Sequence, residues 1–581
     1  MKMRFNRMRP HIRFTGKWLS ACWLSLGLLL TPLSGAEPVT ASMGMVTSST
    51  QYASDIGVEV LEEGGNAVDA AVAVAYALAV THPAAGNIGG GGFLVLYRHS
   101  GEVTAIDYRE TAPAGASEKM YQDESGQVVT RLSRVGPLAS GVPGTVAGLS
   151  YTLEKYGTMP LKRLIQPAIS LAREGFTVSP RLARSLNAHR QSLGQNLLAR
   201  DIYVPRDTLQ AGDTLRFPRL ANTLDLIADQ GASAFYQGHI ADNIVETMEM
   251  FGGLITREDL KNYTPEERRV IHGTYRGYDI YSMPPPSSGG IAVTGILGVL
   301  EAFPVGAWGL NTAKTVHFTT EAERHIYADR NYFLGDPDYV EMPVDVFTSD
   351  RYYRYIRSLM TARATPSDQV DHLTWERIDS LRAWLPEHEA TTHFSIVDQY
   401  GNAVSNTYTL NGSYGAGYAV VESGFLMNNE MDDFSAKPGV PNMYGLIGAK
   451  ANAIAPGKRM LSSMSPTIVA RDGKPVLVTG SPGGSTIITT VAQIIMNVVD
   501  HHLPVQEAVA APRVHSQWLP DYIYLEPGAI APLDHLRLQH AGHKLRVRGS
   551  IGEANSIYID PDTGLKYSGA DVTRGGTVAG F

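Results

Sequence analysis

Residues 391–411 read TTHFSIVDQYGNAVSNTYTLN, two alternating segments rich in β-branched residues on either side of Gln399-Tyr400-Gly401. A three-residue loop made of a type I turn and a left-handed glycine fits this spacing and predicts a β-hairpin. That register pairs Thr391 with Thr409 across the two strands. Directly paired residues lie on the same face of a sheet, so the two hydroxyls are expected to be neighbours, with Asn411 further along that face.

A glycine pair, Gly483-Gly484, is the second feature of interest. It lies between a predicted strand, PVLVTG (475–480), and a predicted helix that begins near Thr486. The N–H groups of two glycines at such a turn can converge on one point, which suits a developing oxyanion. An ordinary tight turn, and for the paired threonines an ordinary strand position, are the structural alternatives.

A third feature is a set of groups that fits the zwitterionic head of an amino acid. Arginine and hydroxyl groups match an α-carboxylate, and carboxylates match an α-ammonium group. Scattered surface charge is the simpler interpretation of each residue taken alone. The set consists of Arg109, Ser462, Ser463, Glu430 and Asp433.

Composition restricts the chemistry. The chain has 581 residues with 44% apolar residues, enough for a large core. Its one cysteine, Cys22, lies near the N-terminus, so no disulfide, thiol nucleophile or thiolate metal site is expected in the remainder. His325 stands on a predicted helix without a second spaced histidine, and residues 388–393 (HEATTH) lack a zinc-protease pattern. No metal ion or organic cofactor is expected.

The first 36 residues have the features of a secretory signal. They contain six basic and no acidic residues, an apolar run over about 18–30, and the small residues Ser34-Gly35-Ala36. Cleavage after Ala36 and export to a periplasm or to the medium are predicted. Loss of the leader changes the formal net charge from −8 to −14, which argues against nucleic acid and anionic membranes as partners.

The remaining pattern predicts helices and antiparallel strands. A run rich in alanine and valine is expected to form a helix that follows the glycine turn in EEGGNAVDAA (62–71) and ends at Pro83, and strands are expected over 93–99 and 102–109. The order helix, glycines, strand is the reverse of a dinucleotide-binding unit, which excludes that fold. Residues 145–385 are mostly helical by pattern, with a loop over 284–290, and strands return from 391. Antiparallel sheets covered by helices, an α+β architecture, are the expected result.

Many ordered motifs resemble the γ-glutamyltranspeptidases, also called glutathione hydrolases. They extend over nearly the whole chain beyond the leader: GGNAVDAAVA, GNIGGGGF, YRETAP, GVPGTVAGL, PPPSSGG, LPEHEATTHFSIVD, TYTLN, NNEMDDFSAKPGVPNMYGL, LSSMSPT and TGSPGGS. The resemblance implies an N-terminal-nucleophile hydrolase with a four-layer αββα sandwich. It also implies one precursor that cleaves itself between Ala390 and Thr391. The large subunit (37–390) and the small catalytic subunit (391–581) then stay together as a heterodimer.

The resemblance also implies a role for each motif residue. Thr391 is the nucleophile, Thr409 orients it, and the Gly483 and Gly484 amides form the oxyanion hole. The donor's α-carboxylate is held by Arg109, Ser462 and Ser463, and its α-amine by Asn411, Glu430 and Asp433. Family members carry either glutamine or glutamate at position 430, and the effect of Glu430 stays open. The stretch 437–448 matches a lid gated by Tyr444, with an ordinary surface loop as the alternative.

The predicted reaction needs no histidine or aspartate partner. Before cleavage the Thr391 hydroxyl attacks the preceding carbonyl, and hydrolysis of the resulting ester frees an α-amine that can act as the base. The mature enzyme then transfers the γ-glutamyl group of glutathione or a related amide to water, an amino acid or a peptide. A glutaryl or cephalosporin acylase of the same fold and a non-catalytic exported amino-acid-binding protein are the competing hypotheses.

Overall fold

The computed structural model describes residues 38–375, 377 and 393–581. The predicted leader (1–36), Ala390 and Thr391 therefore lie outside the described residues. Within the described ranges, no helix combines the length and the apolar character that a membrane span needs.

Two seven-stranded antiparallel sheets form the centre of the fold. The first has the order β1 (Thr40–Ala41), β18 (Lys566–Ala570), β17 (Asn555–Ile559), β13 (Lys474–Thr479), β12 (Thr467–Arg471), β9 (Tyr278–Ser282) and β8 (Ile271–Tyr275). The second has the order β19 (Thr577–Gly580), β2 (Met45–Ser48), β10 (Phe394–Val397), β11 (Ala403–Thr409), β3 (Gly91–Tyr97), β4 (Val103–Tyr108) and β7 (Glu266–Arg268).

The two sheets pack face to face. Alternate residues of β3 enter two different cores: Leu94 and Leu96 pack with helices, whereas Phe93 and Val95 pack with residues of the first sheet. Because successive strand residues point to opposite faces, this division places β3 between a helical layer and the other sheet. Hydrogen bonds also join the sheets, for example from Ser405 Oγ to the Thr479 carbonyl (3.0 Å).

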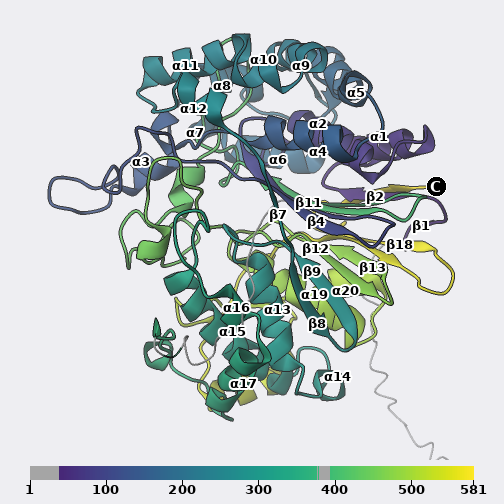
Figure 1. Cartoon of the computed structure of the whole chain (residues 1–581), viewed down its shortest axis with the longest axis vertical. Helices are drawn as coiled ribbons and strands as arrows, with labels where there is room; N and C mark the ends of the chain where they lie inside the picture. Colours follow the sequence, from purple (N-terminus) through teal and green to yellow (C-terminus); the bar gives the residue numbers. More distant parts are fainter. Residues whose placement is uncertain (1–37, 376, 378–392) are drawn as a thin grey trace, which may run out of the picture. The chain divides into compact units, whose positions relative to one another are not determined.

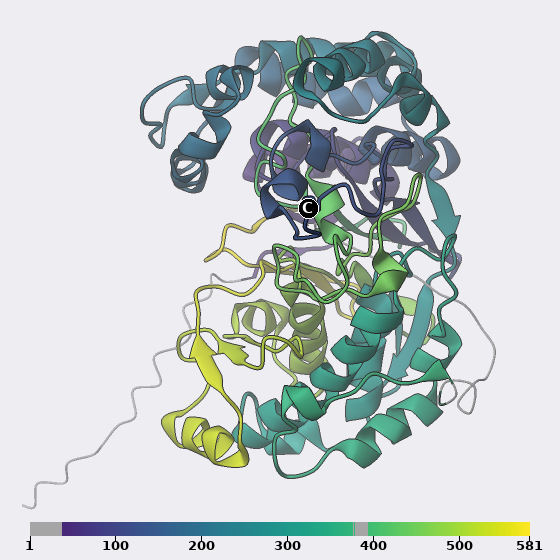
Figure 2. The same cartoon turned by 90° about the vertical axis from the view of Figure 1, so that its left-hand side faces the viewer.

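Helices cover both outer faces, on opposite sides of the paired sheets in Figures 1 and 2. One cover contains α1 (Gln51–Glu62), α2 (Ala67–Thr81), α4 (Thr145–Tyr156), α5 (Leu161–Glu174) and α9 (Pro218–Gln230), and the other contains α13 (Gly289–Leu300), α15 (Ala313–Phe333), α19 (Thr486–Val499) and α20 (Val505–Ala510). The predicted αββα layering is confirmed.

Helix α2 shows how the sequence produces a tightly packed layer. Asn66 caps it, accepting hydrogen bonds from the Val68 and Asp69 N–H groups, while the Asp69 carboxylate accepts from the Asn66 N–H (2.8 Å). This reciprocal arrangement satisfies donors that a helix start leaves unpaired. All of its residues are buried, since alanine and valine allow close approach on every side.

Smaller elements complete the described chain. The helices are α3 (Thr130–Arg134), α6 (Pro180–Ala188), α7 (Arg190–Leu193), α8 (Leu197–Tyr203), α10 (Ala232–Tyr236), α11 (His239–Phe251), α12 (Arg257–Asn262), α14 (Val305–Trp308), α16 (Val344–Phe347), α17 (Asp350–Leu359) and α21 (Pro532–Ala541). The short strands are β5 (Phe176–Thr177), β6 (Thr214–Leu215), β14 (Val514–His515), β15 (Ile523–Leu525) and β16 (Leu545–Val547).

The structure differs at three places from the prediction that residues 145–385 are mostly helical. Residues 266–282 form β7, β8 and β9, because sheet partners stabilise short segments whose own alternation is weak. Residues 183–200, where the pattern indicates one continuous helix, are divided among α6, α7 and α8, with Gly194 at the end of α7. Helix α13 begins at Gly289, inside the stretch expected to be loop.

The predicted hairpin register is confirmed where it is described. Phe394 pairs with Asn406 and Val397 with Ala403, and Gly401 has the left-handed backbone that the turn requires (φ +91°). The predicted pairing of Thr391 with Thr409 lies outside the described residues.

Candidate active site

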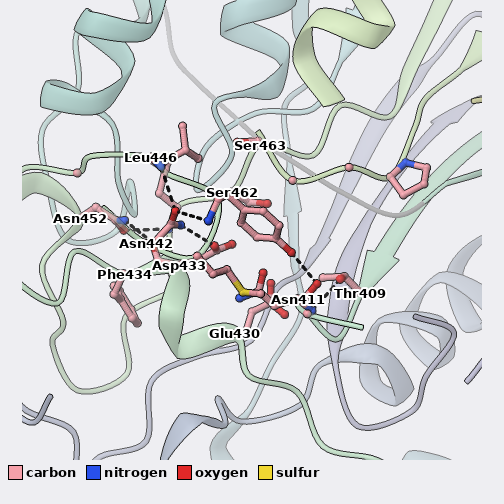
Figure 3. Close-up of a pocket in the computed structure, with 18 of the residues that line it drawn as sticks. Thr409, Asn411, Glu430, Asp433, Phe434, Asn442, Leu446, Asn452, Ser462 and Ser463 are labelled. Atoms are coloured by element: carbon pink, nitrogen blue, oxygen red, sulfur yellow. Dashed lines mark hydrogen bonds between the residues drawn. The ribbon is translucent and has the colours of Figure 1, made fainter. Parts of the chain in front are cut away.

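One cavity of about 390 Å³ brings together residues from distant parts of the sequence. Figure 3 shows many of them pointing into the same space. Of the predicted site residues, those that line it are Thr409, Asn411, Glu430, Asp433, Tyr444, Ser462, Ser463, Gly483 and Gly484. Arg109 lies behind the two acids, fully buried, and contacts both of them. Thr391 is outside the described residues.

Thr409 lies at the end of β11 and faces the cavity. Its Oγ1 accepts a hydrogen bond from the Asn411 N–H (2.8 Å), so its own proton remains available to another acceptor. Its carbonyl accepts from the Asn87 amide (2.9 Å), which anchors the strand end. Asn411 has left-handed backbone (φ +70°), and this turn directs the chain across the cavity wall.

The Gly483-Gly484 turn has backbone that a side chain would disfavour. Both residues have positive φ (+137° and +57°), and the Gly483 carbonyl accepts from the Thr486 N–H (3.2 Å) at the start of α19. Among the described residues, neither glycine N–H donates a hydrogen bond to the protein. Two amides without protein partners beside a cavity can stabilise an oxyanion there.

Arg109 is paired with carboxylates and does not stand open toward the cavity. Its Nη1 donates to Glu430, its Nη2 donates to Asp433 (2.7 Å), and its Nε donates to the Met460 carbonyl (3.3 Å). Burial raises the pKa of Asp433 to about 6, although the Arg109 charge acts in the opposite direction. Burial also raises the pKa of Glu430 well above its ordinary range, with Glu110 and Asp433 adding to the shift.

Glu110, a fourth member of this network, was not among the predicted site residues. The residue is fully buried, its carboxylate lies 3.8 Å from Arg109, and burial raises its pKa to about 7. One guanidinium thus faces three carboxyl groups, which favours protonation of part of the set. An ammonium group in the cavity would add positive charge to this set. The adjacent Arg-Glu pair in YRETAP was the available signal.

Arg330 is a second cavity residue that was not predicted. It lies on the last turn of α15, is buried (4% exposed), and lines the cavity. Its Nη2 donates to Ser463 Oγ (3.1 Å) and its Nε to Ser288 Oγ (2.9 Å). Its spacing along α15 gave no signal, because a helical arginine is most often exposed.

Residues of the segment 437–448, among them Asn442 and Tyr444, line the cavity. The Tyr444 hydroxyl donates to the Asn411 carbonyl (2.7 Å), and a Cβ at Gly484 would lie 2.4 Å from the Tyr444 ring. The Asn442 amide donates to Asp433 (3.1 Å), and the Met443 N–H donates to Asp432 (2.8 Å). The segment is therefore attached both to the acids and to the wall that carries the glycine turn.

We expect Tyr444→Phe to raise the KM for a γ-glutamyl donor about fivefold with little change in kcat, because one hydrogen bond that holds the segment is lost. Steady-state kinetics with γ-glutamyl-p-nitroanilide measure this. Tyr408→Phe is the matched control: its hydroxyl also donates to a carbonyl, that of Ala75 (2.9 Å), but inside the core. An equal KM change in both variants would contradict a role for the Tyr444 bond.

Among the described residues outside the cavity, three buried side chains lie close enough together to suggest a metal site: His317, Glu321 and His543. His317 Nδ1 and His543 Nε2 are 2.7 Å apart, a hydrogen-bond distance. Two imidazole nitrogens on a tetrahedral zinc ion would be about 3.3 Å apart. The nearby Arg324 (Nε 3.6 Å from Glu321) also disfavours a cation. The cluster is best explained as a structural hydrogen-bond network.

Known proteins with similar sequences show which family the chain belongs to. The family model described as Gamma-glutamyltranspeptidase matches residues 53–581. This chain belongs to the γ-glutamyltranspeptidase family. The Escherichia coli (strain K12) glutathione hydrolase proenzyme is 50% identical over 539 residues, which cover 92% of this chain and 91% of that protein.

Solved structures of the γ-glutamyltranspeptidase family and its neighbours agree with the fold. The cephalosporin acylase from Bacillus halodurans matches with a TM-score of 0.83 at 27% identity, covering 94% of this chain and 97% of that one. The Helicobacter pylori γ-glutamyltranspeptidase matches with a TM-score of 0.55 at 46% identity, covering 56% of this chain and 94% of that one. The predicted N-terminal-nucleophile hydrolase fold is confirmed.

Proposed function

We propose that the protein is a γ-glutamyltransferase and glutathione hydrolase that matures by cleaving itself. The observation that carries the proposal is the shared cavity. Groups suited to an α-ammonium, Glu430 and Asp433, line it together with the Ser462-Ser463 pair and a glycine turn whose two amides have no partner among the described residues. The names of the family relatives support glutathione as donor.

Maturation is proposed to cut the chain between Ala390 and Thr391. The products are a large subunit (37–390) and a small subunit (391–581) that remain one αββα unit. Strands of both segments support this, because β11 of the small subunit pairs with β3 of the large one along its whole length. Separation would expose that edge and the apolar faces of both segments.

The proposed reaction uses an ester on Thr391. Its free α-amine takes the hydroxyl proton, the oxygen attacks the γ-glutamyl carbonyl, and the Gly483 and Gly484 amides hold the oxyanion. Collapse expels the leaving amine, for glutathione the amine of cysteinylglycine, which takes up the proton. Water then releases glutamate, or an amino acid or peptide amine forms a new γ-glutamyl amide.

The acids in the cavity argue against the acylase hypothesis. A glutaryl donor carries a carboxylate without the α-ammonium, so it would add net negative charge beside Asp433 and Glu430 with no cation of its own to balance it. We expect kcat/KM for γ-glutamyl-p-nitroanilide to exceed that for glutaryl-7-aminocephalosporanic acid by about 10²-fold or more. Equal values, or a preference for the glutaryl compound, would favour the acylase.

The pH dependence of binding follows from Asp433. Its pKa of about 6 in the empty cavity means that the carboxylate becomes protonated as the pH falls through 6, and a neutral carboxyl holds an ammonium more weakly. We expect the inhibition constant of L-glutamate to rise about tenfold from pH 7 to pH 5. The inhibition constant of glutarate, which has no ammonium, is the control and should not rise. A parallel rise of both constants would contradict the assignment.

Export is proposed from the leader. Its six basic residues, apolar run and small-residue end support cleavage after Ala36 and a periplasmic or secreted location. The acidic net charge of the remaining chain argues against nucleic acid or an anionic membrane as partners, which leaves γ-glutamyl compounds and amine acceptors as the proposed ones.

A further inference from the structure

A basic segment follows the start of α21 and reaches the cavity. Residues 535–548 contain four lysine or arginine residues and no acidic residue, although the chain beyond the leader is acidic overall. Two of the four are paired with acids, in the ion pairs Arg537–Asp534 (3.1 Å) and Lys544–Asp521 (2.7 Å). The other two, Arg546 and Arg548, are exposed and make no ion pair and no side-chain hydrogen bond within the part of the chain that the structure describes. These two charges of the segment remain open to an anion.

Two tyrosine rings hold these guanidinium groups in place. The Arg546 Cζ lies 5.5 Å from the ring centroid of Tyr522, and the Arg548 Cζ lies 5.4 Å from that of Tyr524. The contact repeats because β15 and β16 run parallel and residues two apart on a strand lie on the same face. The Arg548 N–H also donates to the Leu525 carbonyl (2.9 Å), which continues the pairing beyond β16. A guanidinium on a ring face is oriented without using its N–H donors, so it can still hold a carboxylate.

The two arginines differ in their position relative to the cavity. Arg548 lines the cavity together with the Gly483-Gly484 turn, the proposed oxyanion site, whereas Arg546 is not among the lining residues. The contacts proposed for the γ-glutamyl head do not involve Arg548. The part of a glutathione donor that those contacts leave unbound is cysteinylglycine, and its charged group away from the scissile amide is a carboxylate. An open cation beside the reacting carbonyl therefore matches the half of the substrate that has no assigned partner.

We propose that Arg548 is a specificity-determining residue that binds the terminal carboxylate of the peptide released from the donor and, in transfer, the carboxylate of an amino acid or peptide acceptor. An acceptor amine attacks the ester carbonyl from the side that the leaving amine has vacated, so one cation serves both. The proposal rests on the γ-glutamyl function proposed above and adds to it a site for the other half of the substrate.

Three donors with the same γ-glutamyl head test the proposal: glutathione, its glycinamide analogue and γ-glutamyl-p-nitroanilide. Of these, only glutathione has a carboxylate in its leaving group. In the self-cleaved enzyme at low ionic strength, with glutamate release as the common readout, Arg548→Gln should lower kcat/KM for glutathione about fivefold, mainly through KM. The values for the other two donors should change less than about twofold. Arg548→Lys should retain part of the preference for glutathione, because it keeps the charge but not the planar fork.

Arg546→Gln is the matched control, because Arg546 is exposed and stacked on a tyrosine in the same way but lies outside the cavity lining. It removes the same charge and should change kcat/KM for all three donors less than about twofold. Equal losses on glutathione in both variants would reduce the effect to long-range attraction. Equal losses on all three donors in Arg548→Gln would place the residue in the γ-glutamyl half or in the framework of the fold. Either result, or unchanged glutathione kinetics in Arg548→Gln, would overturn the proposal.

Acceptors give an independent readout. With γ-glutamyl-p-nitroanilide as donor, Arg548→Gln should raise the KM for glycylglycine about fivefold and leave that for glycylglycinamide within about twofold. An equal change for both acceptors would count against the acceptor part of the proposal and overturn it. A wild type that uses glutathione and its glycinamide analogue equally well would refute this inference alone, whereas a wild type that releases no glutamate from any of the three donors would refute the proposed function. The two failures are therefore distinguishable.

Discussion

Thr391→Ala is expected to give a single full-length polypeptide with no measurable γ-glutamyl transfer. The substitution removes the hydroxyl that attacks the preceding carbonyl, so neither cleavage nor the free α-amine is produced. Loss of a nucleophile lowers kcat by about 10⁴-fold or more in comparable hydrolases. A denaturing gel of the purified wild type should show two fragments, and N-terminal sequencing of the smaller one should begin at Thr391.

Two further variants make this test specific. Thr391→Ser keeps a hydroxyl and should still cleave itself, more slowly. Thr392→Ala changes the neighbouring residue of the same type and should cleave at the same bond. A smaller fragment that starts at any residue other than Thr391 would refute the proposed mechanism, and an uncleaved wild type with no activity would support the binding-protein hypothesis.

After Thr391→Ala, the largest expected effect is that of Asp433→Asn. It should lower kcat/KM for γ-glutamyl-p-nitroanilide about 10²- to 10³-fold. The substitution removes one partner of a buried charged contact while the donor's ammonium still has to be desolvated. It also leaves one accepting oxygen where the carboxylate has two, so position 433 can no longer accept from both Arg109 Nη2 and Asn442 Nδ2. The loss should appear mainly in KM, because the ammonium is bound equally in the ground and transition states.

Glu430→Gln is the matched variant, and we expect it to change kcat/KM less than about tenfold. Burial together with the neighbouring Glu110 and Asp433 raises the pKa of Glu430, so its carboxyl contributes less negative charge than Asp433. A glutamine oxygen can still accept from Arg109 or from an ammonium. The variant therefore measures what a glutamate at position 430 contributes where other family members have glutamine. A Glu430→Gln loss as large as that of Asp433→Asn would contradict it.

Local sequence signals were sufficient for much of the fold. The alternation on either side of Gly401 predicted the register that β10 and β11 show, because a glycine with positive φ restricts the loop to one length. The glycine turn before it and Pro83 after it likewise predicted the position of α2. By contrast, β7 to β9 were missed, since short strands depend on neighbours that the local pattern does not contain.

The sequence by itself determined the family and the register of the β10–β11 hairpin, and it predicted most residues of the proposed amino-acid site. Only the tertiary structure decided how these charges are matched: Arg109 pairs with the acids, Glu110 stands behind them, and Arg330 reaches the serine pair from α15. The physical reason is that ion pairing and burial depend on distances between residues such as Arg109 and Asp433, which lie 324 positions apart in the chain. Those distances cannot be obtained from residue types and their spacing in the sequence.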